Sequence, residues 1–353
     1  MSTASTERTG LWLIGARGSV ATTTIAGRAA LAAGLWPPTG LVTALPPFAA
    51  SGLPDLDHLV IGGHDIADTP LAKRADELVA GGVLPHGLPS AIASELAAAD
   101  TEIRYPHGDP ALDIADFTRR HGLARTVVVN VATVETDPSV STGYANAAID
   151  AGCSYVNFTP ATGMRGEGLA ERATAAGLPF AGRDGKTGQT LLRAALAPMF
   201  AQRALHVRSW SGTNLLGGGD GAALADPAAA AAKNAGKERV LDDNLGALPE
   251  GTVHIDNVPA LGDWKTAWDH VAFDGFLGTR MVLQTIWEGC DSSLAAPLVL
   301  DLARLVSRAH AVGLAGPVPG LGFFFKDPDS GSAALGDQWR ELVALAETLR
   351  TGS

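Results

Sequence analysis

The first apolar segment of the chain is followed at once by a glycine-containing turn and a helical pattern, which commits the amino-terminal part to an α/β fold. Residues 11–14 (LWLI) form a short predicted strand, residues 15–21 (GARGSVA) the turn, and a helix is expected to about residue 33. The helix N-terminus of such a unit can hold a pyrophosphate. The glycine spacing is one glycine short of the standard dinucleotide fingerprint. Its place after the first strand favours a dinucleotide site over a turn whose glycines serve packing alone.

The acidic residue that usually binds the adenine ribose is missing from its expected place. Residues 40–45 are predicted as the second strand, and they end in Thr43, Ala44 and Leu45. A carboxylate is ordinarily found about 20 residues after the glycine turn. Asp65, which follows the strand-like residues 59–61, is the candidate for that role, and the alternative is that it caps the next helix. Ala44 therefore leaves the choice between NAD and NADP open.

Polar residues follow three further predicted strands. Residues 126–133 (TVVVNVAT) are an almost continuous apolar run, typical of a buried parallel strand, and contain Asn130 and Thr133 near their end. Residues 154–160 (SYVNFTP) repeat the arrangement with Asn157 and Thr159, and residues 178–181 lead to Lys186. Because ligands of open α/β sheets bind at the carboxyl ends of the strands, we expect these side chains to face one crevice.

Lys186 belongs to a Gly-Lys-Thr sequence that is not a phosphate-binding loop of the Walker type. Such a loop needs a glycine five residues before the second glycine, and that position is Phe180. Lysine is rare here, since six of the 26 basic residues are lysines, namely Lys73, Lys186, Lys233, Lys237, Lys265 and Lys326. A lysine can lose its proton when buried and suits acid–base and oxyanion chemistry. Each is therefore a candidate catalytic residue, the alternative being a solvated charge.

The sequence pattern changes in the second half of the chain and indicates a second domain. Strand-like segments at residues 206–214, 252–258, 268–273 and 280–287 indicate a second sheet, followed by a helix at residues 292–312 and a final amphipathic helix. Glycines at 217–221 form an anion-binding nest or a flexible turn. The 353 residues are enough for two cores. The predicted class is α/β, a Rossmann-type domain with a second mixed-sheet α+β domain.

Composition narrows the function classes. The formal charge of −11 argues against nucleic acid and anionic membranes as partners, because both require a basic face, but it allows a small anionic ligand. No apolar run is long enough for a membrane span, and the first residues lack the apolar core of a signal peptide. Cys153 and Cys290 suit neither a disulfide framework nor a metal site. We expect a cytoplasmic protein that binds no metal.

Nine phrases, in the same order, resemble the inositol-phosphate synthases, and most closely their shorter archaeal-type members. The resemblance also allows a paralogue from a carbocyclic-nucleoside pathway. It runs from about residue 11 to the last helix. The phrases are residues 13–20 (LIGARGSV), 62–65 (GGHD), 130–133 (NVAT), 155–160 (YVNFTP), 181–190 (AGRDGKTGQT), 215–221 (LLGGGDG), 262–269 (GDWKTAWD), 295–301 (AAPLVLD) and 323–326 (FFFK).

The resemblance implies an architecture and a reaction. Residues 1–186 and 291–353 would form the NAD-binding domain, residues 187–290 the catalytic and oligomerisation domain, and the assembly would be a homotetramer. The implied reaction converts glucose 6-phosphate into myo-inositol phosphate without net redox change. The carbon-5 hydroxyl is oxidised with NAD, carbon 6 is deprotonated, the enolate attacks carbon 1, and the ketone is reduced again. The enzyme would be an isomerase.

The resemblance also assigns residues to roles. The residues implied to be catalytic are Lys186, Lys326, Lys237, Lys265 and Asp263. Among them, Lys186 and Lys326 would stabilise the enolate and the alkoxide. The substrate-binding group is Asn157, Arg193, Thr213, Asn214 and Lys233. The cofactor-binding group is Gly15, Ala16, Arg17, Gly18, Ser19, Val20, Asp65, Asn130, Ala132, Thr133, Asp184, Gly217 and Asp220.

Two departures from the family pattern leave the substrate open. Arg193 stands where the family usually has a lysine, and Thr213 stands where it has a tyrosine. Such changes would suit an enzyme that closes a five-membered ring from fructose 6-phosphate, or they are neutral drift. The competing classes are an ordinary NAD(P)-dependent dehydrogenase and a non-catalytic dinucleotide sensor.

Overall fold

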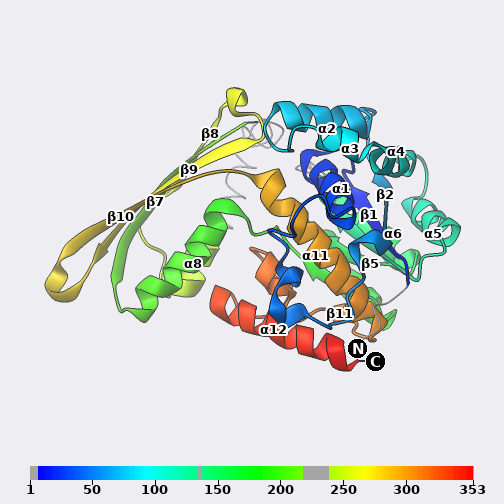
Figure 1. Cartoon of the computed structure of the whole chain (residues 1–353). Helices are drawn as coiled ribbons and strands as arrows, with labels where there is room; N and C mark the ends of the chain where they lie inside the picture. Colours follow the sequence, from blue (N-terminus) through cyan, green and yellow to red (C-terminus); the bar gives the residue numbers. More distant parts are fainter. Residues whose placement is uncertain (1–6, 133–136, 218–237, 353) are drawn as a thin grey trace. The chain divides into compact units, whose positions relative to one another are not determined.

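The computed structural model describes residues 7–132, 137–217 and 238–352, and its contacts divide the chain into two compact units. Unit 1 comprises residues 1–185, 292–331 and 340–353, and unit 2 comprises residues 186–291 and 332–339. Figure 1 labels the elements of both units. The last helix, α12 (Leu335–Thr351), contributes its first residues to unit 2 and the remainder to unit 1.

Unit 1 is built on a seven-stranded parallel sheet with the order β11-β6-β5-β4-β1-β2-β3. β1 pairs with β2 on one side and with β4 on the other, so the strand order reverses beside β1. This is the switch point at which doubly wound sheets bind dinucleotides. The strands are β1 (Thr9–Ile14), β2 (Leu59–His64), β3 (Ile103–Arg104), β4 (Arg125–Asn130), β5 (Ser154–Asn157), β6 (Pro179–Gly182) and β11 (Gly316–Pro317).

The helices of unit 1 bury both faces of this sheet. Trp12 and Ile14 belong to a core cluster with Phe117 of α5 and Tyr144 of α6, while Leu13, which points to the opposite face of β1, is also fully buried. A strand buried on both faces needs a nearly continuous apolar sequence. The helices are α1 (Ser19–Ala32), α2 (Leu71–Ala80), α3 (Leu88–Ala91), α4 (Ala93–Thr101), α5 (Pro110–Arg120), α6 (Pro138–Asp150), α7 (Leu169–Ala175) and α11 (Asp291–Ala311).

The expected strand at residues 40–45 was wrong. Residues Val42–Ala44 form a 3-10 helix, and the strand beside β1 is Leu59–His64. The backbone amides of Val42 and Thr43 donate to the buried carboxylate of Asp301 in α11, at 2.7 and 3.1 Å. Prolines at 37, 38, 46 and 47 flank the segment, and proline cannot donate to a sheet ladder. Ala44 therefore does not occupy the ribose-binding position of the fold.

Unit 2 contains a four-stranded sheet with the order β10-β9-β7-β8. β9 pairs antiparallel with both β7 and β10, whereas β8 pairs parallel with β7. One face packs on α8 (Gly188–Gln202; Figure 1). Phe200 of α8 belongs to one core cluster with Trp210 and Val271 of the sheet. The strands are β7 (His206–Leu216), β8 (Val253–Asn257), β9 (Trp264–Asp274) and β10 (Arg280–Cys290).

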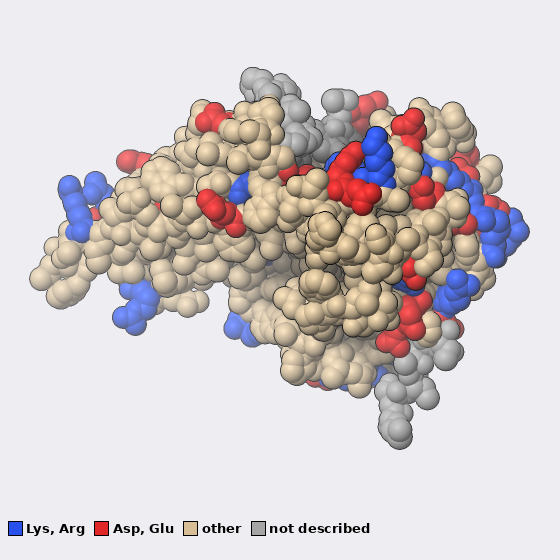
Figure 2. All heavy atoms as spheres, turned by 45° about the horizontal axis from the view of Figure 1, so that its top comes forward, with Lys and Arg blue, Asp and Glu red and all other residues tan. Residues whose placement is uncertain are grey.

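The strands and helices predicted for the second half are confirmed where they are described, while residues 218–237, which include most of the glycine-rich segment, lie outside the described residues. Figure 2 shows acidic and basic side chains on the same face of the molecule. Within the described part of the chain, no helix has the length and apolarity to cross a membrane.

Candidate functional site

The turn after β1 is shaped as a dinucleotide cradle. Gly15 has φ +83°, and a Cβ there would lie 2.7 Å from the Cα of Ala132, so only glycine fits. The amides of Gly15 and Ala16 donate to the His64 carbonyl at 2.9 and 3.1 Å. α1 begins after Gly18, and no described side chain caps its N-terminus. The helix dipole and the first amides of α1 thus favour an anionic group such as a pyrophosphate.

Asp65, the predicted ribose-binding acid, lies at the end of β2 beside the glycine turn. It follows β2 directly, and its carboxylate accepts hydrogen bonds from the amides of Arg17 (2.7 Å) and Ala67 (2.8 Å). The Arg17 guanidinium is turned to the carbonyl of Thr69 (2.8 Å) and forms an ion pair with Asp100. The acid therefore lies beside the glycine turn, where a carboxylate can take ribose hydroxyls. These residues fit NAD.

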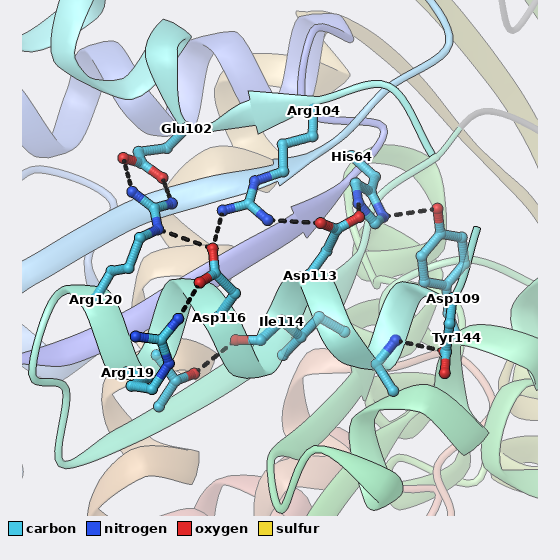
Figure 3. Close-up of polar contacts among 12 residues, drawn as sticks. His64, Glu102, Arg104, Asp109, Asp113, Ile114, Asp116, Arg119, Arg120 and Tyr144 are labelled. Carbon is cyan, nitrogen blue, oxygen red and sulfur yellow. Dashed lines mark hydrogen bonds and ion pairs between the residues drawn. The ribbon is translucent and has the colours of Figure 1, made fainter. Parts of the chain in front are cut away.

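The end of β2 is anchored through the side chain of His64, which is 1% exposed (Figure 3). Its Nδ1 lies 3.1 Å from the Tyr144 hydroxyl, and its Nε2 lies 3.1 Å from Asp113 Oδ2. Arg104 binds the other oxygen of Asp113 at 2.5 Å and also binds Asp116 at 2.8 Å. Burial lowers the pKa of His64, which favours the neutral ring. This network fixes the end of β2, whose His64 carbonyl accepts the amides of the cofactor turn. Apart from the Gly-Gly-His-Asp phrase, no sequence motif indicated it.

The two predicted amide residues of unit 1 organise the loops that follow their strands. Asn130 Oδ1 accepts a hydrogen bond from the amide of Ala132 at 3.1 Å. Asn157 Oδ1 accepts from the hydroxyl of Thr159 at 2.8 Å, and its Nδ2 donates to the Ala161 carbonyl at 2.6 Å. Both side chains are buried. A direct contact of Asn157 with substrate stays a prediction.

Lys326 and Asp184, predicted separately, form an ion pair in unit 1. Lys326 Nζ lies 2.9 Å from Asp184 Oδ1, and the Lys326 amide donates to the Asp184 carbonyl at 2.7 Å. The two residues are 142 positions apart in the sequence. Asp184 thereby fixes the position of one of the two lysines that the resemblance places at the substrate.

Lys186, one of the predicted catalytic residues, is a buried lysine with a lowered pKa. It stands just before α8, is 4% exposed, and donates from Nζ to Oε1 of Gln338. Burial lowers its pKa to about 7. An amine with such a pKa exists both as ammonium and as free base near neutral pH, which suits proton transfer as well as stabilisation of an oxyanion. Gln338 has no counterpart in the sequence-based site.

Arg193, predicted to bind substrate, is held in a buried network around Asp269. Its Nη2 lies 2.7 Å from Asp269 Oδ1, and the same oxygen accepts from Trp210 Nε1 at 2.8 Å. Gln189 Nε2 donates to Asp269 Oδ2 at 2.7 Å, and Gln189 Oε1 accepts from Asn214 Nδ2 at 2.8 Å. The guanidinium therefore serves as the counter-ion of Asp269, and the network fixes the side chain of Asn214.

Four further predicted residues lie in or next to the strands of unit 2. Lys265 donates to Asp291, which also accepts from the Thr187 hydroxyl at 3.4 Å, whereas Asp263 lies half-buried before β9. Asn214 and Thr213 are consecutive in β7 and point to opposite faces of the sheet, with Thr213 beside Trp268. Only one of them can belong to a site on the face that α8 covers.

The structure shows ordinary packing or hydrogen bonds for some of the remaining predicted residues, and the others lie outside the described residues. Ser19 Oγ accepts a hydrogen bond from Arg74 at 2.7 Å, and Val20 follows it in the first turn of α1. Gly217 packs so closely that a Cβ would lie 2.7 Å from the Val258 carbonyl oxygen. Thr133, Asp220, Lys233 and Lys237 lie outside the described residues.

Fold and site together define a dinucleotide-binding α/β enzyme with a second domain that carries a buried lysine. Two family models described as Myo-inositol-1-phosphate synthase match this chain: the NAD-binding one over residues 9–104 and another over residues 188–292. The chain belongs to the myo-inositol-1-phosphate synthase family, and its cofactor is NAD.

Known proteins resemble it over most of its length. It is 29% identical to inositol-3-phosphate synthase 1 of Bacteroides thetaiotaomicron over 92% of this chain and 90% of that one. It is 29% identical to inositol-3-phosphate synthase 1 of Bos taurus over 83% of this chain, but spans only 64% of that protein. The crystal structure of inositol-3-phosphate synthase from Caenorhabditis elegans shares the fold with a TM-score of 0.82 at 22% identity, over 99% of this chain and 87% of that one.

Replacing Asp269 with Asn is expected to destabilise unit 2 by about 3–5 kcal/mol, because it leaves the buried Arg193 guanidinium without a counter-ion. Urea unfolding followed by tryptophan fluorescence measures the change, and Trp210 lies in the network. The control is Asp150→Asn, which removes the exposed ion pair with Arg172 and should cost about 0–1 kcal/mol. Equal effects of the two variants would contradict the role given to Asp269.

Proposed function

We propose that this enzyme converts glucose 6-phosphate into inositol phosphate, and that it uses NAD catalytically. The observation that carries the proposal is Lys186, a buried amine whose pKa is lowered to about 7, two residues before the segment that matches the synthase model. The NAD cradle around Gly15 and Asp65 supplies the redox part of the reaction. We further expect the enzyme to act in the cytoplasm, where Cys153 and Cys290 stay reduced.

The chemistry assigns distinct tasks to the described residues. NAD, held beside Gly15 and Asp65, would supply the hydride acceptor for oxidation at carbon 5 and the hydride donor for the reduction after ring closure. In between, carbon 6 loses a proton and forms a bond with carbon 1, and negative charge develops on the ketone oxygen and then on the aldehyde oxygen. We expect the ammonium forms of Lys186 and Lys326 to stabilise these oxyanions. Lys326 is positioned by Asp184, and Asn214 by Gln189.

Two structural observations support glucose 6-phosphate over fructose 6-phosphate. The fructose alternative depended on Thr213 and Arg193 as changes in the substrate pocket. Arg193 is committed to Asp269, and Thr213 points to the sheet face opposite Asn214. Neither position therefore argues for a pocket reshaped to accept a ketone. The relatives named above are also called inositol-3-phosphate synthases.

The open face of the sheet in unit 2 supports self-association, and we propose the homotetramer expected for the family. Trp264 and Trp268 of β9 share this face with Val282 and Ile286 of β10, because Trp268 pairs with Ile286 in the register. All four side chains are exposed, from 36% for Trp268 to 70% for Ile286. Exposed apolar side chains gathered on one face are typical of a protein interface.

The reaction predicts its product and the fate of the cofactor. Purified enzyme with glucose 6-phosphate and a trace of NAD should form a six-membered cyclitol phosphate, identified by carbon NMR, with no accumulation of NADH at its absorbance band. Stoichiometric NADH would instead indicate an ordinary dehydrogenase. A branched cyclopentane from fructose 6-phosphate alone would reject glucose 6-phosphate as the substrate.

Lys186→Ala should lower turnover about a hundredfold or more, because it removes a positioned cation from developing negative charge. Circular dichroism should show an unchanged fold. Lys73→Ala is the control, since Lys73 is exposed on α2 and should keep the wild-type rate. If turnover in Lys186→Ala fell by less than a few-fold, this lysine would have no catalytic role.

Ile286→Glu should reduce the size of the assembly measured by sedimentation velocity, because a charge at the centre of the open face cannot be buried without a partner. The control is Leu112→Glu on α5, where Leu112 is 69% exposed, similar to the 70% of Ile286. A wild-type protein that sediments as a monomer would contradict the proposed interface.

A further inference from the structure

Gln338 lies in the first turn of α12, far from Lys186 in the sequence, and meets it inside unit 2. The two residues are 152 positions apart, and the Gln338 side chain accepts the hydrogen bond from Lys186 Nζ through Oε1. Gln338 is 1% exposed, so water does not compete freely for this acceptor. Burial of a polar side chain to this degree is costly unless both ends of the amide are bonded.

The other end of the amide is occupied, which fixes its orientation. Gln338 Nε2 donates to the Ser332 carbonyl at 2.8 Å. The Ser332 hydroxyl accepts from the amide of Ala334 at 3.2 Å and lies 3.2 Å from Asp337 Oδ2, so the turn before α12 is itself held in place. A flipped amide would set its NH₂ group against the donors of Lys186 and its carbonyl oxygen against the Ser332 carbonyl. Only the carbonyl oxygen can therefore face the lysine.

From this geometry we infer that Gln338 is a positioning residue for Lys186, one that holds Nζ in place with a neutral acceptor. The inference rests on the proposed role of Lys186 in the reaction. A carboxylate at this place would favour the ammonium form, whereas an amide leaves the protonation of the lysine to be governed by burial. The lysine can then change its protonation state during the reaction without losing its position.

The carboxylates that neighbour this pair in unit 2 have partners of their own. Asp291, at the start of α11, accepts from Lys265 and from the hydroxyl of Thr187. Asp337, the residue before Gln338, lies within hydrogen-bond distance of the Ser332 hydroxyl. In unit 1, Asp184, two residues before Lys186 in the chain, is paired with Lys326. Burial is the cause of the lowered pKa of Lys186.

The test compares Gln338→Glu with Gln338→Met in the full-length enzyme. The pH dependence of Lys186 acetylation by trace acetic anhydride, read by peptide mass spectrometry, reports the titration of the amine without turnover. In Gln338→Glu the added carboxylate should move the labelling midpoint upward by about one pH unit or more. The kcat–pH profile should move in the same direction. In Gln338→Met the lysine loses its acceptor, and kcat should fall about tenfold or more at every pH, with KM changed far less.

Gln202→Glu is the matched control, because Gln202 is exposed at the end of α8 and the substitution adds the same charge. It should leave labelling and kcat unchanged. The inference would be overturned if the Lys186 labelling midpoint in Gln338→Glu equalled that of the wild type, as it should in Gln202→Glu. If Gln338→Met fails to fold, the labelling of Gln338→Glu decides alone. A shifted midpoint with unaltered turnover would support the contact and reject the catalytic role of Lys186, so the two failures are distinguishable.

Discussion

The parallel pairing of β1 with both β2 and β4 is the constraint on which the cofactor site depends. A strand paired on both sides and buried on both faces has no freedom of position, so the turn at its end is set by its two neighbours. β2 contributes the His64 carbonyl, which takes the amides of Gly15 and Ala16, and β4 leads to Ala132, which leaves no room for a side chain at Gly15. The α1 N-terminus and Asp65 are placed by the same pairing.

In unit 2 the corresponding constraint is the cost of burying polar groups without partners. Arg193, Gln189 and Asn214 are all buried, and Asp269 connects them through a chain of hydrogen bonds. Lys186 and Gln338 form a second closed arrangement. Such networks are stable only when every member is satisfied, which makes them rigid. Rigid placement of an amine and an amide is what stabilisation of a developing oxyanion requires.

Most of the architecture could be read from the sequence, because apolar runs and the glycine turn are local signals. The strand at residues 40–45 failed because the proline-rich segment after α1 offered an apolar stretch of the right length without the ability to pair. The ribose acid was sought at a fixed spacing, but the intervening segment delays β2, and Asp65 takes the place at the strand end.

The candidate site was less accessible to sequence reasoning, because its contacts join distant parts of the chain. Gln338 and Asp291 carry no motif that would connect them with Lys186 and Lys265. The structural role of Arg193 depends on Asp269, which lies 76 positions away. By contrast, the separation of Thr213 from Asn214 follows from the two-residue period of a strand and could have been inferred from β7 alone.

The central claim is that the oxidation at carbon 5 is reversed on the same molecule, and isotope tracing tests it most directly. Glucose 6-phosphate carrying deuterium at carbon 5 would be converted by the purified enzyme with unlabelled NAD, and the product analysed by deuterium NMR and mass spectrometry. The account predicts that the deuterium is retained in the cyclitol phosphate, at the ring carbon derived from carbon 5. Deuterium recovered in released NADH, or lost from that carbon to solvent, would contradict it.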